Sequence, residues 1–358
     1  MEQGGVETVV CGINRLLAEA GWETVVVSGG GRLAGEIERA GGRHVTVDLK
    51  SKNPLTYFVR AARLRRVLAA ERPDVVFAHS RVPAWLFRWA SRGLGIPWVT
   101  FAHGANSVSR YSAVMTKGDR VLVPSRFVAD HLTAHYAFDV AKLRVVAPAV
   151  DPARFDTGRL DAGFMAEKRR EWKLDGALVV MAVGRLSPVK GYETLLRAFA
   201  RLGTAASRLV IVGGVDRAHA GHAEALKALA AELGIASRTV FAGAQSRVAE
   251  CLALADVVVS SNVTKPESFG LSMAEALTMG RPVVAKAFGG ALDVVRPGVD
   301  GVLVADGPDL PGRFAEAIDR AGSGKIRPSR EEALERFSPN VMKSKIISIC
   351  CELTGAQK

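Results

Sequence analysis

Two carboxylates frame a glycine-containing turn in the second half of the chain. Glu267 and Glu275 stand eight residues apart in the stretch PESFGLSMAEALTMGRPVVAKAFGG, residues 266–290. The pattern predicts a loop that ends at Gly270 and a helix after it, with one carboxylate before the helix and the other two turns inside it. Unpaired N–H groups at the start of a helix favour a phosphate. A nucleotide sugar has hydroxyls on both sides of a diphosphate. Its hydroxyls would donate hydrogen bonds to the two carboxylates, and its diphosphate would accept them from the N–H groups at the helix start.

Two cations precede this segment in the stretch LVVMAVGRLSPVKGYETLLRAFARL. Residues 178–183 are an apolar run, Gly184 interrupts it, and a helical spacing of apolar residues follows. The pattern predicts strand, loop and helix, with Arg185 and Lys190 on the loop at the carboxyl end of a strand. Open α/β sheets bind ligands at that end. Two cations there would neutralise a diphosphate and stabilise it as a leaving group.

These two blocks resemble the E-x7-E and G-R-x5-K-G motifs of family 4 of the retaining glycosyltransferases, in the same order and at a similar separation. The resemblance implies the GT-B fold, in which two Rossmann-like domains face each other across a cleft. It implies that Glu267 contacts the donor sugar and Glu275 the nucleotide ribose. The loop and helix start between them would complete the donor site with Ser268, Phe269, Gly270 and Leu271.

The first half adds three positions to this resemblance. The sequence GGVE at residues 4–7 is similar to the family's N-terminal G-G-x-E turn, which implies that Gly5 binds the donor. His103 follows the apolar run WVTFA and is expected at a strand end, where the family has a histidine near the donor sugar. The pair SR at 125–126 resembles another donor contact, through Arg126. Because the family has a strand before the G-G-x-E turn, we expect the first strand of this domain to be missing.

Apolar runs alternate with helical patterns along both halves of the chain. Strands that alternate with helices in this way predict parallel sheets covered on both faces, and therefore an α/β fold with two doubly wound domains. We expect strands at 23–28, 43–48, 74–79, 97–102, 120–124, 143–147, 178–183, 208–212, 238–242, 256–260, 282–285 and 301–304.

The Pro-containing stretch APAVDPARFD predicts the boundary between the domains. We expect an N-terminal acceptor-side domain at 1–150 and a donor-binding domain at 151–335. Residues 336–358 include the helical stretch VMKSKIISICCEL. The resemblance implies that this helix crosses back to the first domain, although the sequence fits an ordinary terminal helix equally well.

Composition is consistent with two ordinary domains in a reducing compartment. The chain has 358 residues, of which 48% are hydrophobic. Its four cysteines have neither disulfide-framework nor metal-ligand spacing. The sequence contains no apolar run of membrane-spanning length, and its first residues lack the pattern of a signal peptide. We expect a cytoplasmic protein, soluble or peripheral at the inner face of the cytoplasmic membrane.

The first half is strongly basic. Residues 1–150 contain 20 Lys and Arg against 12 Asp and Glu. In the helical stretch RVPAWLFRWASR, one face combines two tryptophans with arginines, which suits an anionic membrane surface. A solvated basic face with partly packed tryptophans is the alternative. Nucleic acid is not expected, because no binding module accompanies the charge. The residues on this face are Arg81, Trp85, Arg88, Trp89 and Arg92.

A glycine pattern in the first half also fits a dehydrogenase. GGGRLA at 29–34 satisfies G-x-G-x-x-G/A, and Asp48 follows at the end of the next expected strand. The pattern is short, however, and no nicotinamide-side site follows it. We therefore expect these glycines to form a strand-to-helix turn.

The resemblance implies a retaining glycosyltransferase that needs no metal and no cofactor. Glu267, His103, Arg185 and Lys190 would act on the reacting groups, and the two cations with the helix start would replace a metal on the diphosphate. The substrates expected are a nucleotide-diphosphate sugar and a glycan or glycolipid acceptor, because the 264–285 block resembles transferases of lipopolysaccharide core and cell-envelope glycans. Two alternatives are a nucleotide-sugar epimerase of GT-B fold and a non-catalytic nucleotide-sugar-binding protein.

Overall fold

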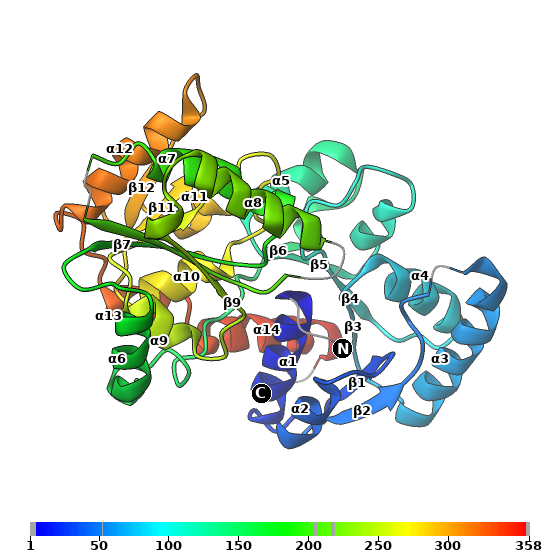
Figure 1. Cartoon of the computed structure of the whole chain (residues 1–358). Coiled ribbons are helices and arrows are strands. Elements are labelled where there is room, and N and C mark those ends of the chain that lie inside the picture. The colour runs from blue at the N-terminus through cyan, green and yellow to red at the C-terminus, as the bar shows by residue number, and fades with distance from the viewer. Residues whose placement is uncertain (1–4, 52, 204–205, 216–218, 356–358) are drawn as a thin grey trace. The chain divides into compact units, whose positions relative to one another are not determined.

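A computed structural model describes residues 5–51, 53–203, 206–215 and 219–355. The chain divides into two compact units, Met1–Ala149 with Pro339–Lys358 and Val150–Ser338. Both contain parallel strands covered by helices (Figure 1), so the predicted α/β fold with parallel sheets is confirmed.

The second unit contains a six-stranded parallel sheet in the order β12-β11-β10-β7-β8-β9. Its central strands are apolar and largely buried, as expected for a sheet covered on both faces. The strands are β7 (Leu178–Val183), β8 (Ser207–Val212), β9 (Thr239–Gly243), β10 (Val257–Ser260), β11 (Val283–Lys286) and β12 (Gly301–Val304). The helices are α6 (Ala162–Glu171), α7 (Tyr192–Phe199), α8 (Ala220–Glu232), α9 (Val248–Ala253), α10 (Leu271–Thr278), α11 (Ala291–Val294), α12 (Leu310–Gly322) and α13 (Arg330–Arg336).

The strand order of this sheet reverses at β7. The chain runs from β7 outward through β8 to β9, and then returns to add β10 on the other side of β7. The loops that leave β7 and β10 therefore diverge at one point along the carboxyl edge of the sheet. In open α/β sheets, ligands bind at such a switch point.

The first unit contains a two-stranded parallel sheet and a four-stranded parallel sheet in the order β3-β4-β5-β6. The strands are β1 (Val25–Ser28), β2 (Arg43–Thr46), β3 (Val76–Ala78), β4 (Trp98–Phe101), β5 (Arg120–Val123) and β6 (Leu143–Val145). The helices are α1 (Gly5–Ala18), α2 (Ala34–Arg39), α3 (Tyr57–Glu71), α4 (Arg81–Ala90), α5 (Arg126–His135) and α14 (Pro339–Thr354).

Helix α14 packs in the first unit, although almost two hundred residues separate it from β6 along the chain. Its apolar residues share a core with α1, β4 and β5. Arg120 Nε donates to Glu352 Oε2 at 2.8 Å, and Lys345 Nζ donates to the carbonyl oxygen of Val145 at 3.0 Å. The last helix is therefore an integral part of the first unit's core.

The glycine pattern at 29–34 forms a turn between β1 and the short helix α2. Gly30 and Gly31 have φ values of 76° and 122°, which non-glycine residues rarely adopt. The carboxylate of Asp48 accepts hydrogen bonds from the backbone N–H groups of Lys50 and Ser51, at 3.0 and 3.1 Å. The glycines therefore form the expected strand-to-helix turn, and Asp48 has a local structural role.

Candidate functional site

The loop between β7 and α7 carries the two predicted cations. Arg185 is exposed two residues after β7, and the buried Leu186 that follows it anchors the loop. Lys190 ends the short 3-10 helix Pro188–Lys190. Its Nζ lies 2.5 Å from Oε1 of Glu267, and both side chains are about a quarter exposed, at 23% and 25%. Two motif residues separated by 77 positions thus form an ion pair.

Close backbone packing holds Lys190 in this position. A Cβ atom on Gly184 would lie 2.9 Å from Lys190 Cε and 3.2 Å from its Nζ, so the end of the lysine side chain packs directly against Gly184. Tyr192 Oη donates to the carbonyl oxygen of Gly184 at 2.7 Å, which closes the loop from the other side. Any larger residue at position 184 would displace the ammonium group.

The loop after β10 is joined to the β7 loop by side-chain hydrogen bonds. Ser261 Oγ donates to the carbonyl oxygen of Lys190, and Asn262 Nδ2 donates to that of Val189, both at 2.9 Å. A Cβ on Gly191 would lie 2.0 Å from the carbonyl oxygen of Ser261, so the two backbones touch. The loops that diverge at the switch point are therefore one connected structure.

Gly289 and Gly290 pack against the backbone of the segment that carries Glu267. The N–H of Gly290 donates to the carbonyl oxygen of Glu267 at 2.8 Å. A Cβ on Gly289 would come within 2.7 Å of the same oxygen, and one on Gly290 within 2.4 Å of Phe269 Cα. The Gly-Gly turn thus packs directly against the backbone of the loop that carries Glu267.

Helix α10 begins where the sequence predicts. Gly270 caps it with a φ of 99°, and the carbonyl oxygen of Gly270 accepts from the N–H groups of Met273 and Ala274. Preceding N–H groups at a helix start have no partner within the helix and favour an anion. Ser268 and Leu271 are partly exposed, whereas the ring of Phe269 is buried and meets the ring of Phe337 edge-on at 5.9 Å. Phe269 can therefore contribute its backbone to a ligand, but its ring stabilises the unit.

Glu275 lies in the second turn of α10 and differs from Glu267 in its surroundings. Burial raises the pKa of its carboxyl to about 7, and the charge of Arg154 opposes that shift. No hydrogen bond or ion pair joins this carboxylate to another residue in the part of the chain that the structure describes. A partly buried carboxylate with unused acceptor capacity is suited to ligand hydroxyls.

The first unit has its own group of predicted residues. His103 follows β4, and its Nε2 lies 2.9 Å from Nδ1 of His79, which follows β3. Burial lowers the pKa of His103 well below its usual value and that of His79 to about 4. Sequence reasoning missed His79. The signal that could have found it is a repeat, because both strands end in Phe-Ala-His, at 77–79 and 101–103.

The other predicted positions of this unit lie at helix starts. Ser125 is buried and caps α5, with its Oγ accepting from the N–H of Val128 at 3.3 Å. Arg126 is the first residue of that helix and is exposed. Gly5 opens α1, whereas Gly4, the other glycine of the G-G-x-E pattern, lies outside the described residues.

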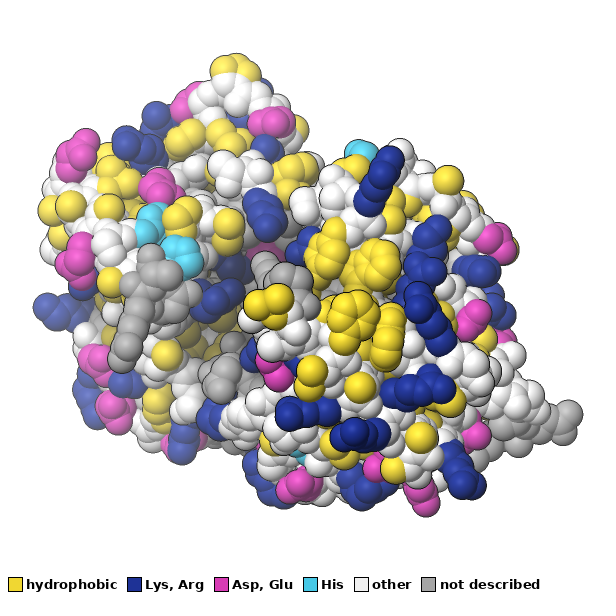
Figure 2. Space-filling view, turned by 90° about the vertical axis from the view of Figure 1, so that its right-hand side faces the viewer, with side chains coloured by type: hydrophobic (Ala, Val, Ile, Leu, Met, Phe, Trp, Pro, Cys, Tyr) yellow, Lys and Arg dark blue, Asp and Glu magenta, His cyan; other side chains and the backbone are white. Residues whose placement is uncertain are grey.

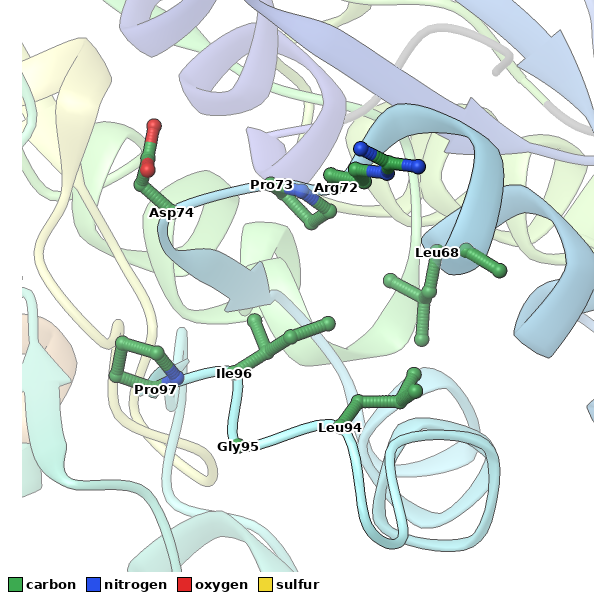
Figure 3. A pocket seen from close by; sticks show the side chains of 9 residues that line it. Leu68, Arg72, Pro73, Asp74, Leu94, Gly95, Ile96 and Pro97 are labelled. Carbon is green, nitrogen blue, oxygen red and sulfur yellow. The ribbon is translucent and has the colours of Figure 1, made fainter.

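A shallow pocket of the first unit lies away from these residues. It is formed by the end of α3 and the segments that precede β3 and β4, with side chains of Leu68, Leu94 and Ile96 around it (Figure 3). It is therefore at the amino ends of the two strands whose carboxyl ends carry His79 and His103. None of the predicted site residues lines this pocket.

Sequence families match nearly the whole chain. Residues 164–341 match the family described as Glycosyl transferases group 1, and residues 3–154 match Glycosyltransferase Family 4. A D-inositol 3-phosphate glycosyltransferase from Acidothermus cellulolyticus is 35% identical over 299 residues, which cover 76% of this chain and 65% of that protein. One from Mycolicibacterium smegmatis is 32% identical over 294 residues, or 73% and 63%. The chain thus spans slightly less than two thirds of these relatives.

Solved structures share the fold at low sequence identity. A glycosyltransferase from Rickettsia africae has a TM-score of 0.90 and 24% identity, covering 100% of this chain and 98% of that one. HepE from Anabaena, in complex with UDP and glucose, has a TM-score of 0.83 and 20% identity, with 98% and 96% covered. At such identities the similarity concerns the fold alone.

Proposed function

Because the chain belongs to the family 4 glycosyltransferases and has their GT-B fold, we propose that it transfers a sugar from a nucleotide-diphosphate donor to an acceptor hydroxyl. The observation that carries the proposal is the Lys190–Glu267 ion pair at the switch point of the second unit. It combines a cation suited to a diphosphate with a carboxylate suited to sugar hydroxyls. The UDP and glucose bound to HepE belong to the same ligand class.

Each residue has a defined role in this proposal. Arg185, Lys190 and the start of α10 stabilise the diphosphate as it leaves. Glu267 orients hydroxyls of the donor sugar, Glu275 accepts from ribose hydroxyls, and His103 of the first unit contacts the sugar or the leaving phosphate. The charge stabilisation comes from these groups, so transfer proceeds without a metal or a cofactor.

Transfer proceeds with retention of configuration. The bond between the anomeric carbon and the diphosphate oxygen breaks, and the acceptor oxygen forms the new bond on the same face. The acceptor proton passes to an oxygen of the leaving diphosphate, which the cations hold close to the reacting carbon. Glu267 orients the sugar in this scheme and forms no covalent bond with it.

Two acceptor classes are proposed, each for a specific reason. A glycan or glycolipid of the cell envelope, including lipopolysaccharide, fits the aromatic and basic surface described below and the resemblance of the 264–285 block. A phosphorylated polyol fits the names of the sequence relatives, which are D-inositol 3-phosphate glycosyltransferases. The enzyme would glycosylate an acceptor of either class at the cytoplasmic side of the membrane.

One experiment distinguishes these possibilities. The protein is incubated in excess chelator with a panel of nucleotide sugars, alone, with a bacterial lipid-glycan extract, or with D-inositol 3-phosphate. We expect nucleoside diphosphate and a new glycoside to appear together, and only when an acceptor is present. Conversion of the donor without acceptor indicates an epimerase, and binding without turnover indicates a non-catalytic protein. Turnover that requires a metal contradicts the proposed source of charge stabilisation.

We also propose that the first unit docks on anionic lipid through an aromatic patch, which consists of Phe58, Trp85, Trp89 and Tyr111. The rings of Phe58 and Trp89 meet edge-on at 5.7 Å, and those of Trp85 and Tyr111 stack at 6.4 Å. Figure 2 looks onto the side of the molecule where Figure 1 labels α3 and α4. It shows large hydrophobic side chains gathered there, with Lys and Arg side chains beside them. Arg88 lies over Trp85, and Arg81 lies over Tyr111. Aromatic rings beside arginines suit an interface with anionic headgroups.

The structure corrects one detail of the expected helical face, and it shows the partial packing of a tryptophan that the alternative interpretation expected. Helix α4 ends at Ala90, so Arg92 lies beyond it and not on its face, and the carbonyl oxygen of Arg92 accepts from Arg65. Trp85 is partly buried and donates its Nε1–H to the carbonyl oxygen of Tyr111 at 2.9 Å. The tryptophans therefore also stabilise the unit. No helix in the described parts of the chain has the length and apolarity needed to cross a membrane.

Replacing Phe58 and Leu55, an exposed residue three positions before it in the chain, by serine should lower binding to phosphatidylglycerol vesicles by about a hundredfold or more, because each apolar side chain that inserts contributes about 1.5–3 kcal/mol. Both are highly exposed, at 63% and 87%, so the variant should fold normally. Sedimentation with vesicles measures binding, which should also weaken with added salt. Val140→Ser, which removes another exposed apolar side chain from the same unit, is the matched control. Equal binding by the double variant and the control would contradict lipid docking at this patch.

A further inference from the structure

The aromatic rings of the two Phe-Ala-His sequences contact one another at the carboxyl ends of β3 and β4. β3 and β4 pair in parallel, with Phe77 opposite Val99 and Ala78 opposite Thr100. Because side chains alternate along a strand, each phenylalanine and the histidine two residues later lie on the same face. Ring stacking at 6.4 Å within the first sequence and 4.2 Å within the second is consistent with this arrangement.

The two histidines of these sequences contact each other directly. The rings of His79 and His103 stack at 5.2 Å and 18°, and Nδ1 of His79 lies 2.9 Å from Nε2 of His103. His79 also lies 5.8 Å from the ring of Phe101. The geometry thus fixes which ring nitrogen of each histidine is used in the pair.

Both imidazoles are neutral near pH 7. Burial is the main cause that lowers both pKa values, and the charge of His79 adds to it for His103. No carboxylate or cation in the described part of the chain contributes to either shift. A neutral imidazole has one N–H and one acceptor nitrogen, so in this pair one ring donates and the other accepts. The proton position on His103 is therefore coupled to that on His79.

His103 has one ring nitrogen left for a ligand. Its Nε2 is used by His79, and among the described residues no hydrogen bond is made to its Nδ1. The proposed ligand is a nucleotide-diphosphate sugar, whose phosphate oxygens only accept hydrogen bonds. A neutral imidazole donates to such an oxygen only from the nitrogen that carries its proton. Donation to the ligand thus requires the Nδ1–H form of His103, in which Nε2 accepts from His79.

We propose that His79 is a positioning residue: by donating its Nδ1–H to Nε2 of His103, it holds the proton of His103 on Nδ1 and aims it at the ligand. The role at the ligand rests on the proposed function, whereas the proton position is a property of the resting protein. His79 acts on transfer through His103 and needs no contact with the substrate.

The proton position is read by nitrogen NMR of the full chain labelled with 15N-histidine. The signals of His79 and His103 are assigned from their loss in His79→Asn and His103→Gln. We expect His103 in the Nδ1–H form from pH 6 to 8, and the same form in His79→Asn, whose amide N–H occupies the place of the imidazole donor. Asp at the same position can only accept, so His79→Asp should move the proton to Nε2. An Nε2–H form in the unsubstituted protein overturns the proposal, without reference to any variant.

Transfer activity provides the second readout. His79→Asp should lower kcat by about a hundredfold, the usual effect of losing one donor to a developing oxyanion, whereas His79→Asn should stay within about threefold. The pH profile should also change, because the introduced carboxylate raises the pKa of His103. Equal kcat in the Asn and Asp variants, with both folded, overturns the proposal. Absence of transfer by the unsubstituted protein with every donor and acceptor overturns the proposed function alone, since NMR reads the resting state.

Discussion

Replacing Lys190 by methionine lowers kcat by about a hundredfold to a thousandfold and changes the donor KM much less. Methionine preserves most of the length of the side chain but removes the charge that faces Glu267 and the proposed diphosphate. Charge on the leaving group increases in the transition state, so a cation there stabilises the transition state more than bound donor. Steady-state kinetics with varied donor separates the two parameters.

Lys227→Met is the matched control for this variant. Lys227 is an exposed lysine of α8 in the same unit and pairs with Glu224, so its replacement changes the net charge equally. We expect its kinetics to equal those of the unsubstituted protein. A Lys190→Met enzyme with normal kcat and a raised KM would show that the lysine only binds the donor.

Glu267→Gln tests whether the ion pair acts as a unit. The variant should also lower kcat, since Glu267 then loses the charge that holds Lys190. Residues that act together show non-additive effects. The combined Lys190→Met and Glu267→Gln enzyme should therefore lose less than the product of the two single losses. Strictly multiplicative losses would indicate that the two side chains act separately.

The sequence predicts the strands well because each is a short apolar run between turn residues. Observed strand ends differ from the expected ones by two residues at most. In β7 and β10, the run is buried on both faces, so nearly every residue contributes to the signal. The loops that carry Lys190 and Glu267 follow from these strands, because a parallel sheet aligns the strands' carboxyl ends.

What the sequence does not show depends on contacts between distant segments. His79 precedes His103 by 24 residues, and only the pairing of β3 with β4 brings the two rings together. The expected helical face also extends too far. An ideal helical projection continues through Arg92, whereas α4 ends at Ala90 and Gly93 adopts a φ of 75° just beyond it. Periodicity describes the helix interior and gives less information about where the helix ends.

The burial of Glu275 is a further property that the sequence does not contain, and it has a measurable cost. The pKa of this carboxyl rises from 4.5 to about 7 on folding, mainly because burial disfavours the charged form. A group with a raised folded-state pKa contributes its full stability below pH 4.5 and loses it as pH rises toward 7. The free energy of unfolding should therefore fall by about 3 kcal/mol across this window because of Glu275 alone.

Glu275→Gln should remove this loss, because glutamine has the same shape and does not ionise. We expect the variant to be about 3 kcal/mol more stable than the unsubstituted protein at pH 8 and nearly equal to it at pH 4. Urea unfolding of both proteins at pH 4, 6 and 8 measures the difference. Glu232→Gln, at an exposed position of α8, is the control and should show no such trend. A constant difference between variant and unsubstituted protein at all three pH values would contradict the burial argument.

The same substitution should weaken nucleotide binding while it stabilises the fold. A carboxylate accepts from two ribose hydroxyls at once, whereas a glutamine side chain has one acceptor oxygen. Affinity for a nucleoside diphosphate should fall by about tenfold, the loss of about one hydrogen bond to a charged group. Calorimetry with the 2′,3′-dideoxy nucleotide provides the decisive comparison, because that ligand lacks both hydroxyls and should bind the two proteins equally. If the Glu275→Gln variant binds both ligands more weakly to the same extent, Glu275 does not contact the ribose. If the variant binds only the ribose-containing nucleotide more weakly, Glu275 contacts the ribose. Its cost to stability at neutral pH is then offset by its role in binding.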